Sequence, residues 1–205
     1  MGKFYRFGNM MPPDYYKTRT YYLAEKPFKI AGNLYFVGNT WCASHLIDTG
    51  DGLILLDVPC QSELPYLLES IWELNFDPRD IRDIIISHAH IDHYGSVNAL
   101  KKLTGATTYL SDVDAEDMEV HAERFANMAG EFNGGNYPFK PDVRLQDGDM
   151  ISRGNASICC ILTPGHTVGV MSHFWELEEE GRTYKVGIYG GAGFVSLKKE
   201  FLAAA

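Results

Sequence analysis

The sequence is poor in three things: basic residues, long hydrophobic runs and paired cysteines. Eighteen basic residues against 27 acidic ones give a formal net charge of −9. A chain with this balance lacks a basic surface that could neutralise phosphates, which excludes nucleic acid as an expected partner. No apolar run reaches the roughly 20 residues that span a bilayer, and residues 1–6 lack the apolar stretch of a signal peptide. We therefore expect no membrane partner and a cytoplasmic protein.

The few cysteines point to structural rather than redox roles. The chain has four, and none lies in a CxxC pair: Cys42, Cys60, Cys159 and Cys160. The last two are adjacent in an apolar run, where successive side chains point to opposite faces of a strand. All four are predicted to be reduced residues of the core.

What the sequence does contain is enough for one folded domain. Of its 205 residues, 45% are hydrophobic and 13% aromatic, so a sizeable core can form without disulfides. Residues 1–26 are rich in Tyr, Pro and charge and show no period, which predicts an N-terminal arm. Residues 27–205 contain no repeat or linker and are expected to form a single domain that acts on a small molecule.

The first half of this domain alternates strands with amphipathic helices. Strands are predicted at residues 33–38, 44–48, 53–57, 83–86 and 107–110, the first three antiparallel and separated by Gly-containing turns. A helix capped by Ser62 should follow the third strand, and another is predicted from Ser96 to Leu103, ending at Gly105. Residues 113–132 have a weakly apolar helical pattern, closed by a loop at 134–138.

The second half consists mainly of strands. Residues 157–162 form an apolar strand, and residues 171–177 and 184–190 are predicted to pair as a hairpin around Glu180 and Gly181. Strand meanders mixed with helices, in two halves, indicate two sheets packed face to face with helices outside. This predicts an α/β sandwich.

The strongest chemical signal is a dense group of metal-binding side chains directly after the buried strand at 83–86. The segment His88-Ala89-His90-Ile91-Asp92-His93 supplies three imidazoles and a carboxylate, which are ligands that zinc accepts. In an extended loop, residues 88, 90 and 92 would face one way while His93 turns toward a second metal. The alternative, a cluster of surface or capping histidines, is disfavoured by the position after a buried strand.

A second histidine loop follows the strand at 157–162. His166 lies in Pro164-Gly165-His166-Thr167, where Pro and Gly fix a tight turn. Taken alone, His166 is as compatible with a structural role as with metal binding.

Other side chains near these loops receive different interpretations. His45 is predicted to be a buried hydrogen-bonded residue or a partner of a metal ligand, rather than a ligand itself. His121 is predicted to be a surface residue, while His173 faces either the cleft or the core. Asp57 is a candidate to accept a hydrogen bond from a metal-bound imidazole. Tyr94, with Trp41 and the 120–140 insert, either walls the cleft or packs in the core.

The chain resembles the metallo-β-lactamase fold superfamily, because His88-Ala89-His90-Ile91-Asp92-His93 meets its HxHxDH signature and His166 its later histidine motif. The resemblance covers about residues 27–195 and implies a four-layer αββα sandwich. It also implies one or two Zn²⁺ ions, the first held by His88, His90 and His166 and the second by Asp92 and His93. Within the superfamily, the chain looks most similar to the β-lactamase subclass whose second zinc is held by Asp, His and His.

The chain departs from the superfamily pattern in two places. Many relatives have an Asp or Cys ligand where this chain has Gly190-Gly191-Ala192-Gly193, which argues against the usual thioesterase and nuclease site but agrees with the β-lactamase subclass named above. That subclass takes its last histidine from a C-terminal segment, whereas no histidine follows His173 here. Either the sandwich lacks its C-terminal segment, or the second metal site is one ligand short.

The resemblance implies a zinc-dependent hydrolase in which zinc-bound hydroxide opens a cyclic amide or ester, such as a β-lactam or lactone. Asp92 would be the catalytic residue that orients the hydroxide, either with a proton-transfer role or as a ligand alone. Two alternatives remain. An iron protein for electron transfer or oxygen reduction would need more carboxylate than this loop offers, and a non-catalytic descendant would keep a zinc and bind a ligand or partner.

Overall fold

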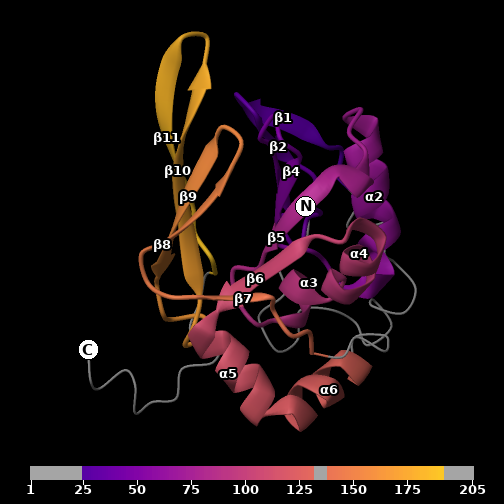
Figure 1. Ribbon diagram of the computed structural model, residues 1–205. Helices are drawn as coiled ribbons and strands as arrows, with labels where there is room; N and C mark the ends of the chain where they lie inside the picture. Colours follow the sequence, from indigo (N-terminus) through magenta and orange to yellow (C-terminus); the bar gives the residue numbers. More distant parts are fainter. Residues whose placement is uncertain (1–24, 132–137, 192–205) are drawn as a thin grey trace, which may run out of the picture.

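A computed structural model describes residues 25–131 and 138–191 of the chain (Figure 1). Most of the predicted arm at 1–26 and of the loop at 134–138 lies outside the described residues. So do Ala192, Gly193 and residues 201–205.

The larger of two sheets has seven strands in sequential order. They are β1 (Phe28–Ala31), β2 (Leu34–Phe36), β3 (His45–Asp48), β4 (Leu53–Leu56), β5 (Ile81–Ile85), β6 (Thr107–Ser111) and β7 (Val143–Leu145). The pairing is antiparallel from β1 to β4, as predicted for the early strands, and parallel from β4 to β7. The carboxyl ends of β4, β5 and β6 therefore point to the same edge of the sheet.

Strand β4 shows why its sequence is apolar without alternation. Leu53 and Leu55 belong to the core beneath the helices, whereas Ile54 and Leu56 belong to the core between the sheets. All four side chains are buried, because both faces of the strand are covered.

Helices cover the outer face of the seven-stranded sheet. These are the 3₁₀ turn η2 (Gln61–Glu63), α2 (Leu64–Glu73), η3 (Pro78–Asp80) and α4 (Val97–Thr104). Ser62 does not cap α2, contrary to prediction: it lies inside η2, and Glu63 occupies the N-cap position. The predicted end of α4 is confirmed, since Gly105 adopts φ +70° at its C-cap, a conformation that favours glycine.

The insert after β6 is helical, as predicted, but it is not one continuous helix. It consists of α5 (Asp112–Val120) and α6 (Ala122–Glu131), with His121 between them. Figure 1 shows both helices beyond the carboxyl end of β6. Their position puts them next to the loops that leave the parallel strands.

The second sheet has four antiparallel strands, in the order β11-β10-β9-β8. They are β8 (Asp149–Arg153), β9 (Ala156–Leu162), β10 (Met171–Glu179) and β11 (Arg182–Ile188). The hairpin turn at Glu180 and Gly181 is as predicted, with φ of +50° and +73°. Strands β7 and β8 were not predicted, because each contributes a single residue to the core between the sheets, Leu145 and Ile151 respectively.

The two sheets pack face to face, and Figure 1 shows helices on the far side of the larger one. Apolar side chains of both sheets form one core between them, and a second core lies between the larger sheet and the helices. This confirms the predicted two-sheet sandwich. In the described part of the chain, no helix covers the outer face of the β8–β11 sheet (Figure 1). None of the described helices is long and apolar enough to cross a membrane.

Candidate metal centre

Two loops, one from each sheet, bring the predicted ligands together. The first leaves the carboxyl end of β5 and carries His88 and His90, and the second leaves β9 and carries His166. A backbone hydrogen bond from Met171 to Ser87, 2.9 Å long, joins the two segments. Residues 76 positions apart in the chain thereby meet at one edge of the sandwich.

The loop after β5 is not fully extended, contrary to the prediction that residues 88, 90 and 92 alternate on one side. A short helix, α3 (Ile91–Tyr94), begins directly after His90. Asp92 and His93 therefore lie on a helical turn. Hydrogen bonds from the His93 and Tyr94 backbone to the His90 carbonyl close this turn.

Three of the predicted ligands form a compact cluster. One ligand atom from each of His88, His90 and His166 lies within 4.8 Å of the others. His90 Nδ1 is 2.9 Å from His166 Nε2, and the rings of all three histidines contact one another edge to face. Such close packing of imidazoles suits a shared cation, because neutral rings offer their lone pairs to it.

Hydrogen bonds fix which nitrogen of His88 and His93 carries the proton. Asp57 accepts from the Ser87 backbone N–H (2.7 Å), from Ser87 Oγ (2.7 Å) and from His93 Nδ1 (2.8 Å). Since the Ser87 hydroxyl proton is given to Asp57, its oxygen accepts from His88 Nδ1 at 3.0 Å. The Nδ1 atom of each ring is therefore the donor in these bonds, and Nε2 is the nitrogen left to face a metal.

Asp92 and His93 form a second pair of ligand atoms beside the cluster. Asp92 Oδ2 lies 3.6 Å from His93 Nε2, and both side chains are partly exposed. The rings of His88 and His93 are 4.0 Å apart between centroids, so the two groups adjoin. In the described ranges, no third ligand joins this pair in a compact group.

Burial keeps two of the cluster imidazoles neutral. It lowers the pKa of His88 far below the usual value and that of His90 to about 4, with the Asp92 carboxylate opposing the shift at His90. Burial also disfavours a charge on His93, but Cys42 and the Asp57 carboxylate outweigh it and raise the pKa of His93. Neutral imidazole is the form that binds a metal.

The residues present fit a zinc ion. The His88 Nε2 atom is buried and has no hydrogen-bond partner, which costs free energy unless a ligand satisfies it. Three nitrogens with an adjacent carboxylate match the donors and the open position of catalytic zinc sites. His88, His90 and His166 are therefore able to hold one ion.

The remaining predicted residues separate into core and surface. His121 is exposed and bonds Asp117 at 2.8 Å, as expected of a surface residue. His173 is 1% exposed and lies in the core, where burial lowers its pKa to about 4. His45 lies outside the metal cluster, as predicted, and is half-buried, with no hydrogen-bond partner at its Nδ1 atom. Tyr94 packs in the core against Phe139.

The cysteines fit their predicted role only in part. All four are free, and three are buried: Cys42, Cys60 and Cys160. Cys159 is half-buried, because it faces away from the core that contains Cys160. Cys42 also lies beside the centre, with its sulfur 3.8 Å from His93 Nδ1, the nitrogen that faces away from the metal position.

Sequence reasoning missed two residues that support the histidine loops, Ser87 and Asp114. Ser87 precedes the HxHxDH segment directly, so its position was a usable signal. Asp114 lies in the helical insert, and nothing local connects it to the centre. Its contacts with both loops are non-local and become visible only in the structure.

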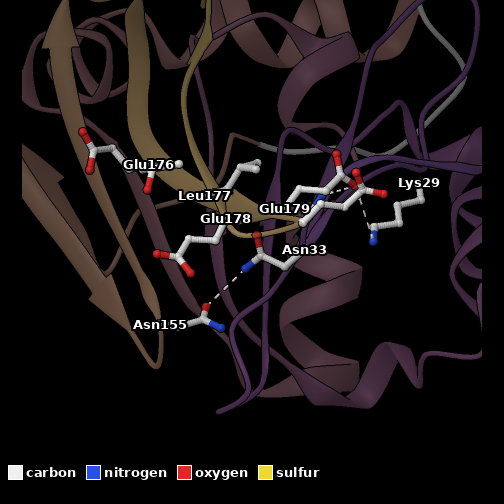
Figure 2. Close-up of a pocket in the computed structure, with 10 residues that line it drawn as sticks. Lys29, Asn33, Asn155, Glu176, Leu177, Glu178 and Glu179 are labelled. Carbon is white, nitrogen blue, oxygen red and sulfur yellow. Dashed lines mark hydrogen bonds and ion pairs between the residues drawn. The ribbon is translucent and has the colours of Figure 1, made fainter.

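A large cavity lies elsewhere, between the β10–β11 hairpin and the β1–β2 turn. It has a volume of about 750 Å³. Figure 2 shows Glu176, Glu178 and Glu179 along β10 and an ion pair between Glu179 and Lys29. The lining contains none of the five predicted ligands and no buried nucleophile, so we do not assign the chemistry to this cavity.

Comparison with protein families agrees with the geometry of the centre. The family described as "Metallo-beta-lactamase superfamily" matches residues 39–178. A probable polyketide biosynthesis zinc-dependent hydrolase of Bacillus subtilis is 28% identical over 96 residues, 47% of this chain and 35% of that protein. A hydroxyacylglutathione hydrolase of Rhodopseudomonas palustris is 30% identical over 96 residues, 47% of this chain and 30% of that protein. The matches therefore span less than half the length of these curated relatives.

Solved structures extend the similarity over most of the chain. A metallo-β-lactamase of Elizabethkingia meningoseptica is similar with a TM-score of 0.78 and 30% identity, covering 100% of this chain and 73% of that one. A subclass B3 metallo-β-lactamase of Bradyrhizobium japonicum gives a TM-score of 0.75 and 26% identity, covering 84% of this chain and 65% of that one.

Proposed function

The chain belongs to the metallo-β-lactamase superfamily, and from this premise we propose that it is a zinc-dependent hydrolase that opens a cyclic amide or ester of the β-lactam or lactone type. The observation that carries the proposal is the convergence of the imidazoles of His88, His90 and His166 beside the Asp92 carboxylate. We assign this activity to a domain formed by residues 27–205.

In this proposal the ligands divide between two positions. His88, His90 and His166 hold the first Zn²⁺, and Asp92 with His93 contributes to the second. When bound, zinc supplies a Lewis acid that polarises a carbonyl and lowers the pKa of a water molecule toward neutrality. The hydrogen bonds from Ser87 and His93 to Asp57 hold the imidazoles in the required orientation.

Asp92 has the position needed to handle the reacting water. Its side chain is 24% exposed, so water reaches it, and Oδ2 faces His93 Nε2. An ionised carboxylate accepts a hydrogen bond from water and orients the oxygen lone pair toward a substrate carbonyl. Asp92 can also receive the proton and pass it to the leaving nitrogen or oxygen, so we assign it the catalytic role.

Two groups of relatives bear on the substrate. Solved structures that are similar over 84% and 91% of this chain are metallo-β-lactamases of subclass B3, which favours a β-lactam-type ring. The curated relatives include proteins named hydroxyacylglutathione hydrolase, but they match over shorter stretches. A substrate panel therefore needs a β-lactam, several lactones and an acyl-glutathione.

A second candidate function is a non-catalytic zinc protein that binds a ligand or partner. It is favoured by the incomplete second site, because in residues 25–131 and 138–191 only Asp92 and His93 are available there. Such a protein would keep one tightly held ion at the three-histidine cluster.

The two candidates are separated by metal analysis and turnover on the full chain. Chelator-sensitive hydrolysis of a chromogenic β-lactam or another panel member supports the hydrolase, whereas one zinc without turnover supports the binding protein. Asp92→Ala should lower kcat/KM by at least about 100-fold, since general acid–base groups contribute 10²–10⁴-fold. The variant should retain zinc at the three-histidine cluster.

The matched control for Asp92→Ala is Asp80→Ala, at an exposed carboxylate on η3. It should keep full turnover. Unchanged turnover in Asp92→Ala, with zinc bound, would overturn the catalytic role of this residue.

A further inference from the structure

Asp114 is a buried carboxylate that the proposed chemistry does not use. It lies in the first turn of α5 and is 1% exposed. Its backbone N–H donates to Ser111 Oγ at 3.1 Å, which anchors this end of the helix. A carboxylate so deeply buried is costly unless donors surround it.

The donors come from both histidine loops. The Ala89 backbone N–H and the Thr167 hydroxyl donate to Asp114 Oδ2, each at 2.8 Å. The Gly169 backbone N–H donates to Oδ1 at 2.9 Å. One carboxylate therefore bonds a loop of the seven-stranded sheet and a loop of the four-stranded sheet.

These contacts are adjacent in sequence to the predicted ligands. Ala89 lies between His88 and His90, and Thr167 follows His166 directly. The spacing between the loops decides whether His166 Nε2 reaches His90 Nδ1, as it does at 2.9 Å. A change in the bonds at Asp114 would move both loops.

Gly169 packs tightly against the Asp114 carboxylate. A Cβ atom added at Gly169 would lie 2.6 Å from Asp114 Oδ1 and 2.5 Å from Ser111 Oγ. The second loop thus rests directly on the start of α5, and only glycine permits this approach.

We propose that Asp114 is a positioning residue that sets the distance between the two histidine loops and thereby the zinc affinity of the three-histidine cluster. This inference rests on the metal site of the proposed function. Both carboxylate oxygens accept hydrogen bonds, so the ionised form fits the site. An asparagine would turn an NH₂ group toward at least one N–H or O–H donor.

The test is the zinc dissociation constant of Asp114→Asn, measured by competition with a chromophoric chelator. Loss of residues that orient metal ligands typically weakens metal binding 10–100-fold, and we expect a loss in this range. The matched control is Asp83→Asn, because Asp83 is also 1% exposed and accepts from Tyr109 and Arg153 away from the histidine loops. The control should lose stability and keep zinc affinity within twofold.

A gentler pair of variants covers the case in which Asp114→Asn does not fold. Thr167→Val removes one donor and keeps the shape of the side chain, so zinc binding should weaken several-fold, and Thr167→Ser should restore it. Folding is checked by circular dichroism. Wild-type zinc affinity in folded Asp114→Asn, or in Thr167→Val, overturns the proposal.

The same measurements distinguish this inference from the proposed hydrolase activity. Suppose that the wild-type chain binds zinc more tightly than Asp114→Asn, and as tightly as Asp83→Asn, and yet hydrolyses no substrate. In that case Asp114 keeps its role and the hydrolase proposal fails. If the wild-type chain binds no zinc, both are overturned.

Discussion

Asp57 illustrates how one side chain can serve two metal positions. It follows β4 with φ +59°, in the left-handed region that Asp tolerates better than most residues. From there its carboxylate accepts from His93 directly and reaches His88 through the Ser87 hydroxyl. The pKa of Asp57 is lowered, because His93 and Ser87 outweigh the opposing effect of burial. A fixed negative charge therefore orients ligands of both proposed sites.

Glu63 gives a prediction for the pH dependence of stability. Burial raises its pKa from 4.5 to about 7, opposed by a hydrogen bond from Asn39 and reinforced by the charge of Asp92. Because the folded-state pKa is raised, the stability contributed by the neutral acid is complete below pH 4.5 and is lost as the pH rises through about 7. Glu63→Gln should remove this loss.

The measurement is the free energy of unfolding from urea titrations at pH 5 and pH 8. The free energy of unfolding of Glu63→Gln, taken relative to that of wild type, should be up to about 3 kcal/mol higher at pH 8 than at pH 5. The control is Glu69→Gln, at an exposed position of α2, whose difference from wild type should be the same at both pH values. An equal difference for Glu63→Gln would contradict the prediction.

At the scale of elements, the helices stabilise the sheet through a narrow apolar side. In α4 the buried residues are Val97 and Leu100, whereas Leu103 is 48% exposed. In α2, Leu67 and Ile71 are buried but Trp72 is 58% exposed. The apolar residues at helical spacing therefore predict a wider buried side for this helix than the structure shows. Each helix stabilises the sheet mainly through its few fully buried side chains.

Two leucines of α4 allow a matched test of this point. Leu100→Ala should lower the free energy of unfolding by about 2–5 kcal/mol, because it leaves a cavity beneath the helix. Leu103→Ala, one turn away, should change it by no more than about 0.5 kcal/mol. Urea denaturation measures both, and equal losses would show that burial in this helix is not what stabilises it.

At the scale of the whole molecule, the candidate centre belongs to neither sheet alone. His88 and His90 follow a strand of the seven-stranded sheet, and His166 follows a strand of the other. A metal that joins them links the two halves of the sandwich. Metal binding should therefore stabilise the packing of one sheet on the other.

Removal of zinc by EDTA should lower the thermal unfolding midpoint of the full chain. A ligand present at 100 times its dissociation constant stabilises by about 2.7 kcal/mol, which corresponds to roughly 5–10 °C for a chain of this size. EDTA already saturated with zinc is the control and should leave the midpoint unchanged. An unchanged midpoint after verified zinc loss would contradict a linking role for the metal.

The sequence by itself determined the features that depend on neighbouring residues. Apolar periodicity identified most strands and both larger helices of the first half, and Gly105 marked a helix end that requires a positive φ. The segment from His88 to His93 predicted the location of the metal centre and its donor types, because ligand density is readable along the chain.

Only the tertiary structure decided the features that depend on distant residues. The predicted role of Asp57 as a hydrogen-bond acceptor for an imidazole of the centre is confirmed at His93. Only the structure showed that α3 places Asp92 and His93 on a helical turn, that Ser87 links His88 to Asp57, and that Asp114 joins the two loops. These contacts join residues up to 55 positions apart, and no local pattern encodes them. The metal-binding motif from His88 to His93 is thus a property of the sequence, whereas the geometry that makes it a site is a property of the fold.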